Sequence, residues 1–281
     1  MFSLSVMNDF LYLGIQAAYM AAQSIMPLYQ QGFWVKLKKD QTPVTHADIA
    51  AHQTITEQLS GSLLPILSEE GVILEAQARQ AIESYWLVDP LDGTREFIKK
   101  NGEFTINIAL IHNQKPHLGV VYAPALGQLY YAHSQLGAYH CELPTNPNLS
   151  LQAFTQHTQP LQAQRLILST KPSTPIRVVM SRSHTPPHTS KYLQTLQNTH
   201  GELSYTHRGS ALKICLVATG EADVYPRFGP TMEWDTAAGQ AIVEAAGGVL
   251  LDACQHTPLV YNKTNLENPS FIAACHASLM V

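Results

Sequence analysis

The stretch from Tyr85 to Thr94 constrains the fold most strongly, because an apolar run ends there in two carboxylates and a glycine. The run Tyr85-Trp86-Leu87-Val88 predicts a buried strand, and Asp89 follows it directly. Pro90 has no N–H to donate, so we expect the regular strand to end at this point. Asp92 comes three residues after Asp89, so one tight turn can direct both carboxylates to the same place.

The two residues that follow favour an anion beside these carboxylates. Gly93 permits backbone angles closed to other residues and a close approach of a ligand. Thr94 offers a hydroxyl where a helix can begin, and the unpaired N–H groups of a helix start attract anions. Carboxylates for a hard cation next to amides for a phosphate are what metal-assisted phosphate chemistry requires. An isolated D-x-x-D-G is more often a plain turn, so the short string alone leaves both interpretations open.

The longer sequence around this motif favours a metal-phosphate site over a plain turn. Asp89-Pro90-Leu91-Asp92-Gly93-Thr94 after an apolar strand resembles the signature of the inositol monophosphatase superfamily, whose members are lithium-sensitive, magnesium-dependent phosphatases. The continuation R-E-F-I-K-K-N-G-E-F-T-I-N-I-A-L-I is similar to one branch, the bacterial CysQ-type 3'(2'),5'-bisphosphate nucleotidases. The resemblance implies an α+β or α/β fold, a layered αβαβα sandwich with N-terminal helices on an antiparallel sheet and a C-terminal α/β lobe.

Composition agrees with a compact enzyme and argues against two other classes. The 281 residues are 45% hydrophobic and 14% charged, which is unlike a disordered chain. The net charge is -4 without a basic block, so we expect no nucleic acid polymer as partner. The four scattered cysteines indicate buried thiols in a reducing compartment, and the polar residues that interrupt the apolar segment 1–31 argue against a signal peptide or transmembrane helix. We therefore expect a cytoplasmic protein; peripheral membrane contact and oligomeric state stay open.

The expected helices and strands fall into two parts, separated near residue 160 by a polar segment. Periodicity predicts a helix from Asp9 to about Gln30, ending near Pro27, and a second helix that starts near Thr45 and runs to about Leu59. Short alternating strands over 104–141 predict an antiparallel meander. The segment 145–174 is polar and carries little signal, and helices and strands alternate after it. We expect an N-terminal α+β lobe over 1–160 and a C-terminal α/β lobe over 161–281.

Two more acidic motifs lie N-terminal to the central string. Asp48 stands three residues after Thr45, and a helix capping box is a sufficient reason for both residues. The resemblance adds that the aspartate of P-V-T-x-A-D positions the attacking water or an additional metal. Glu69 and Glu70 follow a short strand. Adjacent carboxylates repel, which a surface loop tolerates at little cost and a cation beside them would convert into binding. The match to the family's S-E-E motif makes Glu69 a metal ligand.

Asp235 is the last acidic candidate. As an N-cap before Thr236 it has a complete structural explanation. The family pattern W-D-x-x-A-G, present at 234–239, implies instead that Asp235 is a metal ligand contributed by the second lobe. The metals would then lie between the lobes.

The resemblance implies a cofactor of two or three Mg²⁺ ions with oxygen ligands. One ion is expected on Glu69, Asp89 and the carbonyl of Leu91, and the second on Asp89, Asp92 and Asp235. A water oriented by Thr94 and Glu69 would attack phosphorus, with Asp48 in support. The expected catalytic residues are thus Asp48, Glu69 and Thr94.

The implied substrate is a small nucleotide bisphosphate, 3'-phosphoadenosine 5'-phosphate, hydrolysed to AMP and phosphate. Lys213 and Arg227 match positions that contact nucleotide in the family, and Ser210 lies one helical turn before Lys213. Arg182 and His184 are candidates near the base or the distal phosphate, although a surface salt bridge explains any one of these cations equally well. The expected substrate contacts are Glu69, Leu91, Asp92, Gly93, Thr94, Arg182, His184, Ser210, Lys213, Arg227 and Asp235.

Two alternatives remain. The metal motifs fit equally a superfamily phosphatase that acts on inositol monophosphate or a sugar bisphosphate. A non-catalytic nucleotide or metal sensor on the same scaffold is the rival from another class, and the oxygen donor retained at every ligand position argues against it.

Overall fold

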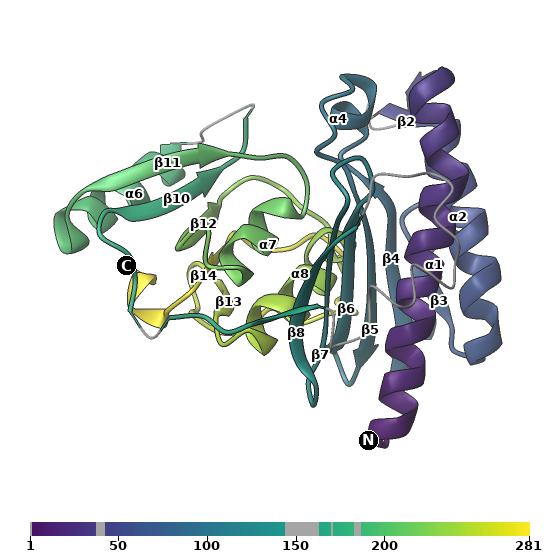
Figure 1. Cartoon of the computed structure of the whole chain (residues 1–281). Coiled ribbons are helices and arrows are strands. Elements are labelled where there is room, and N and C mark those ends of the chain that lie inside the picture. Colours follow the sequence, from purple (N-terminus) through teal and green to yellow (C-terminus); the bar gives the residue numbers. More distant parts are fainter. Residues whose placement is uncertain (1, 38–42, 144–162, 170, 183–186) are drawn as a thin grey trace.

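The computed structural model describes residues 2–37, 43–143, 163–169, 171–182 and 187–281, and its elements stack in layers (Figure 1). Helices α1 and α2 cover one face of a larger sheet, α7 and α8 lie between this sheet and a smaller one, and α6 packs on the smaller sheet. This is the layered αβαβα sandwich predicted from the sequence. Among the described residues the helices are α1 (Leu4–Gln31), α2 (His46–Leu59), α3 (Ala76–Gln80), α4 (Thr94–Ile98), α6 (Pro187–His200), α7 (Leu212–Ala218) and α8 (Glu233–Ala245).

The larger sheet has the order β3-β4-β5-β6-β7-β8-β9 within the described residues. Its strands are β3 (Ile66–Ser68), β4 (Ser84–Asp92), β5 (Thr105–His112), β6 (Lys115–Ala123), β7 (Gln128–His133), β8 (Gly137–Glu142) and β9 (Gln164–Leu166). Every neighbouring pair is antiparallel except β3 and β4, so the predicted meander is confirmed. The boundary expected at residue 160 stays a prediction; β9 lies beyond it and pairs with β8.

The smaller sheet has the order β11-β10-β12-β14-β13. Its strands are β10 (Ile176–Met180), β11 (Leu203–His207), β12 (Val224–Arg227), β13 (Val249–Asp252) and β14 (Phe271–Ala274). Strand β10 runs parallel to β11 and β12, and β14 runs antiparallel to β12 and β13. Strands β1 (Val35–Leu37) and β2 (Pro43–Thr45) form a separate antiparallel pair, and β2 leads into α2.

Strand β4 is buried on both faces, which explains its unbroken apolar run. Trp86 and Val88 belong to the core beneath α1 and α2, whereas Tyr85 and Leu87 belong to the core shared with α7, α8 and the smaller sheet. The carboxyl end of β4 is thereby fixed between two packed layers.

One proline lies inside α1 and another inside β4. Helix α1 runs from Leu4, capped by the Ser3 hydroxyl, to Gln31, so the extent to about Gln30 is confirmed, but Pro27 lies inside the helix and does not end it. Strand β4 extends through Pro90 to Asp92, but its regular pairing with β5 is interrupted there as expected, because one extra residue is accommodated between Asp89 and Asp92.

Candidate active site

Three carboxylates meet where β4 ends beside α8. Oxygens of Asp89, Asp92 and Asp235 all lie within 4.8 Å of one another. The bulge in β4 allows Asp89 and Asp92 to approach the same point, and the first turn of α8 supplies Asp235. The sequence therefore predicted correctly that these side chains come together, although a strand irregularity, and not the expected tight turn, accomplishes it.

The N-cap interpretation of Asp235 is wrong. Helix α8 begins at Glu233, with Met232 before it, and the Met232 N–H donates to Asp235 Oδ2 at 2.9 Å. Asp235 therefore stabilises the helix start from inside the first turn while its carboxylate faces Asp89 and Asp92.

Asp89, Asp92 and Asp235, which we call the acidic group, repel one another when no cation is bound between them. Burial raises the pKa of Asp89 well above its usual range, and the charges of Glu69, Asp92 and Asp235 raise it further. Burial raises the pKa of Asp235 to about 8, with Asp92 adding to it. Burial raises the pKa of Asp92 as well, although Lys213 opposes this shift. A set of oxygen donors that repel one another in a largely buried place fits a divalent hard cation such as Mg²⁺.

Glu69 and Leu91 lie at the margin of this group. Parallel pairing of Ser68 with Val88 places Glu69 next to Asp89, and the Glu69 N–H donates to the Val88 carbonyl at 3.1 Å. Its charge contributes to the raised pKa of Asp89. The Leu91 N–H donates to Asp89 Oδ1 at 3.1 Å, so the main chain of Leu91 lies directly against that carboxylate. Their roles as ligands stay predictions.

Asp48 and Thr94 form a hydrogen-bonded pair beside the acidic group. The Thr94 hydroxyl donates to Asp48 Oδ1 at 3.0 Å. The N–H and hydroxyl of Thr45 donate to Asp48 Oδ2 at 2.7 and 2.6 Å, which confirms the capping box. Burial raises the pKa of Asp48, and these hydrogen bonds oppose the shift. Asp48 thus has both a structural role and a direct contact with Thr94.

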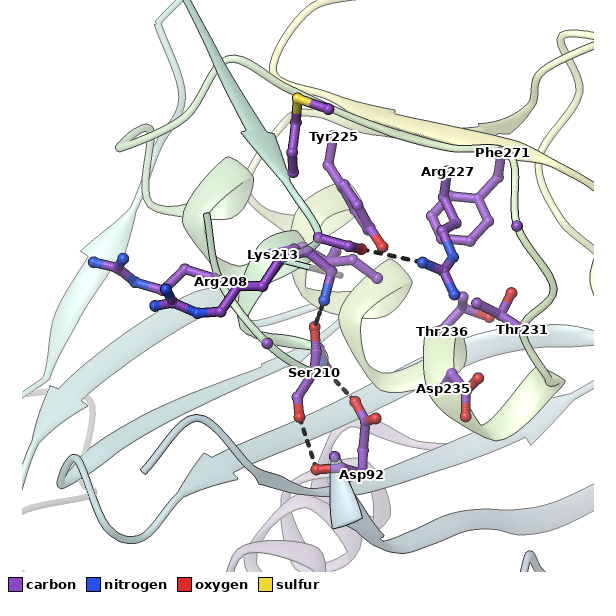
Figure 2. A pocket seen from close by; sticks show the side chains of 18 of the residues that line it. Asp92, Arg208, Ser210, Lys213, Tyr225, Arg227, Thr231, Asp235, Thr236 and Phe271 are labelled. Carbon is purple, nitrogen blue, oxygen red and sulfur yellow. Dashed lines mark hydrogen bonds between the residues drawn. The ribbon is translucent and has the colours of Figure 1, made fainter. Parts of the chain in front are cut away.

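A cavity of about 590 Å³ opens from this acidic group (Figure 2). Its wall includes Asp92 and Asp235 at the acidic end, with Lys213 and Arg227 farther along. Arg182 and Ser210 also line it, so these candidates share one space. His184 lies outside the described residues.

The wall is very close-packed where residues 209–211 lie against the end of β4. Gly93 has φ +89°, and a Cβ built on it would lie 2.3 Å from Ser210 Oγ. The Ser210 hydroxyl donates to the Asp92 carbonyl at 2.7 Å, and the Ala211 N–H donates to Asp92 Oδ2 at 2.6 Å. Ser210 itself has φ +51° and precedes α7, so it occupies a turn and not the helical position we expected.

The cationic candidates differ in how they are held. Lys213 Nζ donates to the Ser210 carbonyl at 2.6 Å and lies 5.4 Å from the centre of the Tyr225 ring. Arg227 donates to Ser181 Oγ and to the Pro230 carbonyl. These contacts hold the Lys213 and Arg227 side chains along the cavity wall.

Sequence reasoning missed Glu103 and Arg208. Arg208 lines the cavity, and Glu103 accepts hydrogen bonds from Arg182 and from the Gly209 N–H. Glu103 and Arg182 are 79 positions apart in the chain, so only the packing of the two sheets brings them together. The motif that contains Glu103 marked the segment without indicating this contact.

Comparison with known proteins places the chain in a family. The sequence model of the inositol monophosphatase family matches residues 7–280. The chain belongs to the inositol monophosphatase family. It is 44% identical over 260 residues to a Salmonella typhimurium protein named 3'(2'),5'-bisphosphate nucleotidase CysQ, covering 91% of this chain and 96% of the relative. The relative of that name from Escherichia coli strain K12 is 43% identical over 261 residues, with the same coverage.

Solved structures agree with this assignment. The crystal structure of CysQ from Bacteroides thetaiotaomicron, described as a bacterial member of the family, superposes with a TM-score of 0.83 at 42% identity, covering 95% of this chain and 97% of that one. An inositol monophosphatase from Thermotoga maritima reaches a TM-score of 0.71 at 23% identity and shows the same fold. The family and the fold predicted from the sequence are therefore confirmed.

Proposed function

We propose that this phosphatase is a Mg²⁺-dependent 3'(2'),5'-bisphosphate nucleotidase that hydrolyses 3'-phosphoadenosine 5'-phosphate to AMP and phosphate. The observation that carries the proposal is the group Asp89, Asp92 and Asp235 at the end of a cation-lined cavity. The names of the relatives from Salmonella typhimurium and Escherichia coli support this substrate class.

The carboxylates, with Glu69 and the Leu91 carbonyl, would hold two or three Mg²⁺ ions. Bound there, the cations supply Lewis-acid stabilisation to the attacking and departing oxygens of an in-line displacement. The Thr94 hydroxyl donates its proton to Asp48 Oδ1, so its oxygen presents a lone pair to the attacking water and orients it. Asp48 is held by Thr45 in the position from which it fixes the direction of the Thr94 hydroxyl.

The cavity beyond the acidic group suits a second phosphate. Five of its lining side chains are cations, and three are carboxylates, of which Asp92 and Asp235 would face Mg²⁺. The cations are Arg95, Arg182, Arg208, Lys213 and Arg227. This excess of positive charge complements a substrate that bears a phosphate away from the reacting one.

Phosphate release is the assay that tests the proposal. With Mg²⁺ present, we expect turnover of 3'-phosphoadenosine 5'-phosphate to exceed that of inositol 1-phosphate by at least about tenfold, and EDTA to abolish it. Equal or better use of inositol 1-phosphate would favour the family's other substrate class. Nucleotide binding without any phosphate release would favour the sensor. Inhibition by Li⁺, a property of the resembled superfamily, is expected in the same assay.

A further inference from the structure

Glu103 joins the larger sheet to the smaller one directly behind the cavity wall. It stands in the segment between α4 and β5, and its side chain is 9% exposed. Glu103 Oε2 accepts from Arg182 Nε at 2.9 Å and from the Gly209 N–H at 2.8 Å, and Oε1 accepts from Arg182 Nη2 at 2.5 Å. All these donors follow strands of the smaller sheet. Glu103 does not itself line the cavity.

The same carboxylate holds a second arginine. Arg208 Nε lies 3.9 Å from Glu103 Oε1, and its Nη1 donates to the His207 carbonyl at 3.0 Å. The side chains of Arg182 and Arg208 are 48% and 42% exposed, and both line the cavity. Figure 2 shows Arg208 and Arg227 on opposite sides of Lys213. Glu103 thus holds Arg182 by two hydrogen bonds and Arg208 by a longer ion pair, and both arginines line the cavity.

We propose that Glu103 is a positioning residue that orients Arg182 and Arg208 to bind the substrate phosphate that is not hydrolysed. This inference rests on the proposed function, because it needs a substrate with two phosphates. The bidentate contact with Glu103 fixes the plane of the Arg182 guanidinium, and the ion pair restricts Arg208. A pre-oriented guanidinium loses less side-chain entropy when it binds phosphate.

The direction in which substrate binding changes when Glu103 is neutralised distinguishes a positioning role from competition with phosphate for the arginines. If Glu103 only competed with phosphate for the arginines, removing its charge would strengthen substrate binding. Since Glu103 instead holds the arginines in place, its removal allows both side chains to move away, and binding weakens.

The test compares the wild-type enzyme with Glu103→Gln on two substrates, 3'-phosphoadenosine 5'-phosphate and adenosine 3'-monophosphate, with Mg²⁺ present. We expect KM for the bisphosphate to rise about tenfold, which corresponds to one strong charge-assisted hydrogen bond. The kcat for the bisphosphate, and both constants for the monophosphate, should stay within about twofold because the acidic group is unchanged. Arg208→Ala should raise the same KM, and inhibition by 5'-AMP should weaken in both variants while inhibition by inorganic phosphate stays unchanged.

Asp223→Asn is the matched control. Asp223 accepts two hydrogen bonds from the Arg177 side chain, at 3.0 and 3.1 Å, in the same bidentate manner but away from the cavity. A general loss of an ion pair would lower the melting temperature of both acidic variants, whereas only Glu103→Gln should change KM.

Three outcomes would overturn the inference: an unchanged KM, a lower KM, or an equal rise for both substrates. If wild-type enzyme hydrolysed neither substrate, the proposed function would fail. Calorimetry with 5'-AMP would still test the inference, because weaker binding by Glu103→Gln and by Arg208→Ala supports it and equal binding contradicts it.

Discussion

Replacing Asp235 with asparagine tests whether the acidic group is built for a cation, because it removes a charge that the folded protein holds at a cost. Burial and Asp92 raise the pKa of Asp235 from its ordinary value of 3.8 to about 8. A raised pKa stabilises the fold at low pH, and that stability is lost as the pH rises through the folded value. The asparagine side chain would still accept the Met232 N–H through its carbonyl oxygen, so the start of α8 is preserved.

The expected change in unfolding free energy follows from the interval between the ordinary aspartate pKa of 3.8 and pH 7. Each pH unit of this interval costs about 1.4 kcal/mol, which sets a ceiling of about 4 kcal/mol at pH 7. Solvent screens part of this cost because Asp235 is only partly buried, so we expect Asp235→Asn to stabilise the metal-free protein by about 1–3 kcal/mol.

The assay is chemical unfolding in EDTA between pH 4 and pH 9, repeated with Mg²⁺. The stability gain of Asp235→Asn should vanish near pH 4 and grow toward pH 8, and Mg²⁺ should stabilise the wild type more than the variant. Asp223→Asn is the control of opposite sign. Burial raises the pKa of Asp223, but hydrogen bonds from Arg177 and Ser173 outweigh burial and lower it, so this variant should lose stability at pH 7. The reasoning would be refuted if, in EDTA, Asp235→Asn were less stable than the wild type at pH 7 and the difference in unfolding free energy were the same at pH 4.

Three further variants test individual parts of the site. Asp92→Asn should fold with unchanged circular dichroism and lose at least about 10³-fold in kcat, since one of the proposed metal ligands is neutralised; retained phosphate release would contradict its role. Thr94→Val keeps the side-chain shape but removes the hydroxyl, so kcat should fall about 10²-fold while KM stays within about twofold, and a change confined to KM would argue against water orientation. Gly93→Ala adds a Cβ 2.3 Å from Ser210 Oγ at φ +89°, and thermal unfolding should show a loss of more than about 2 kcal/mol. Gly247→Ala has φ +99° with nothing within 4 Å, so it should lose clearly less, and equal losses would exclude the clash.

Much of the fold could be predicted because the pattern of burial is visible in the sequence. The continuous apolar run of β4 reflects burial on both faces, and the short strands predicted over 104–141 are found as β5 to β8. The Thr45–Asp48 capping box was predictable for a similar reason, since its contacts span three residues. These features could be predicted because they depend on contacts between residues that are close in the sequence.

Pro27 and Pro90 show what the sequence could not decide about proline. The sequence shows that proline removes a donor, but it does not show whether the surroundings can accept the loss. In β4 the register shift against β5 accommodates Pro90, and this bulge is what allows Asp89 and Asp92 to approach. The bulge depends on pairing with a strand that begins only at Thr105.

The contacts missed from the sequence are those between distant segments. Glu103 meets Arg182 and the Gly209 N–H only after the two sheets have packed together. Neither residue type nor spacing marked the Glu103 carboxylate, because a glutamate after glycine in a polar segment is usually solvent-exposed. The metal ligand candidates were predictable through the resemblance, whereas the residues that support them required the structure.

The most direct test of the central claim is anomalous diffraction from crystals grown with Mn²⁺ as a substitute for Mg²⁺. We predict peaks within about 2.0–2.4 Å of carboxylate oxygens from Asp89, Asp92 and Asp235, with Glu69 contacting one of the ions. Ions bound elsewhere, with these three carboxylates left without metal in the presence of substrate analogue, would contradict the account.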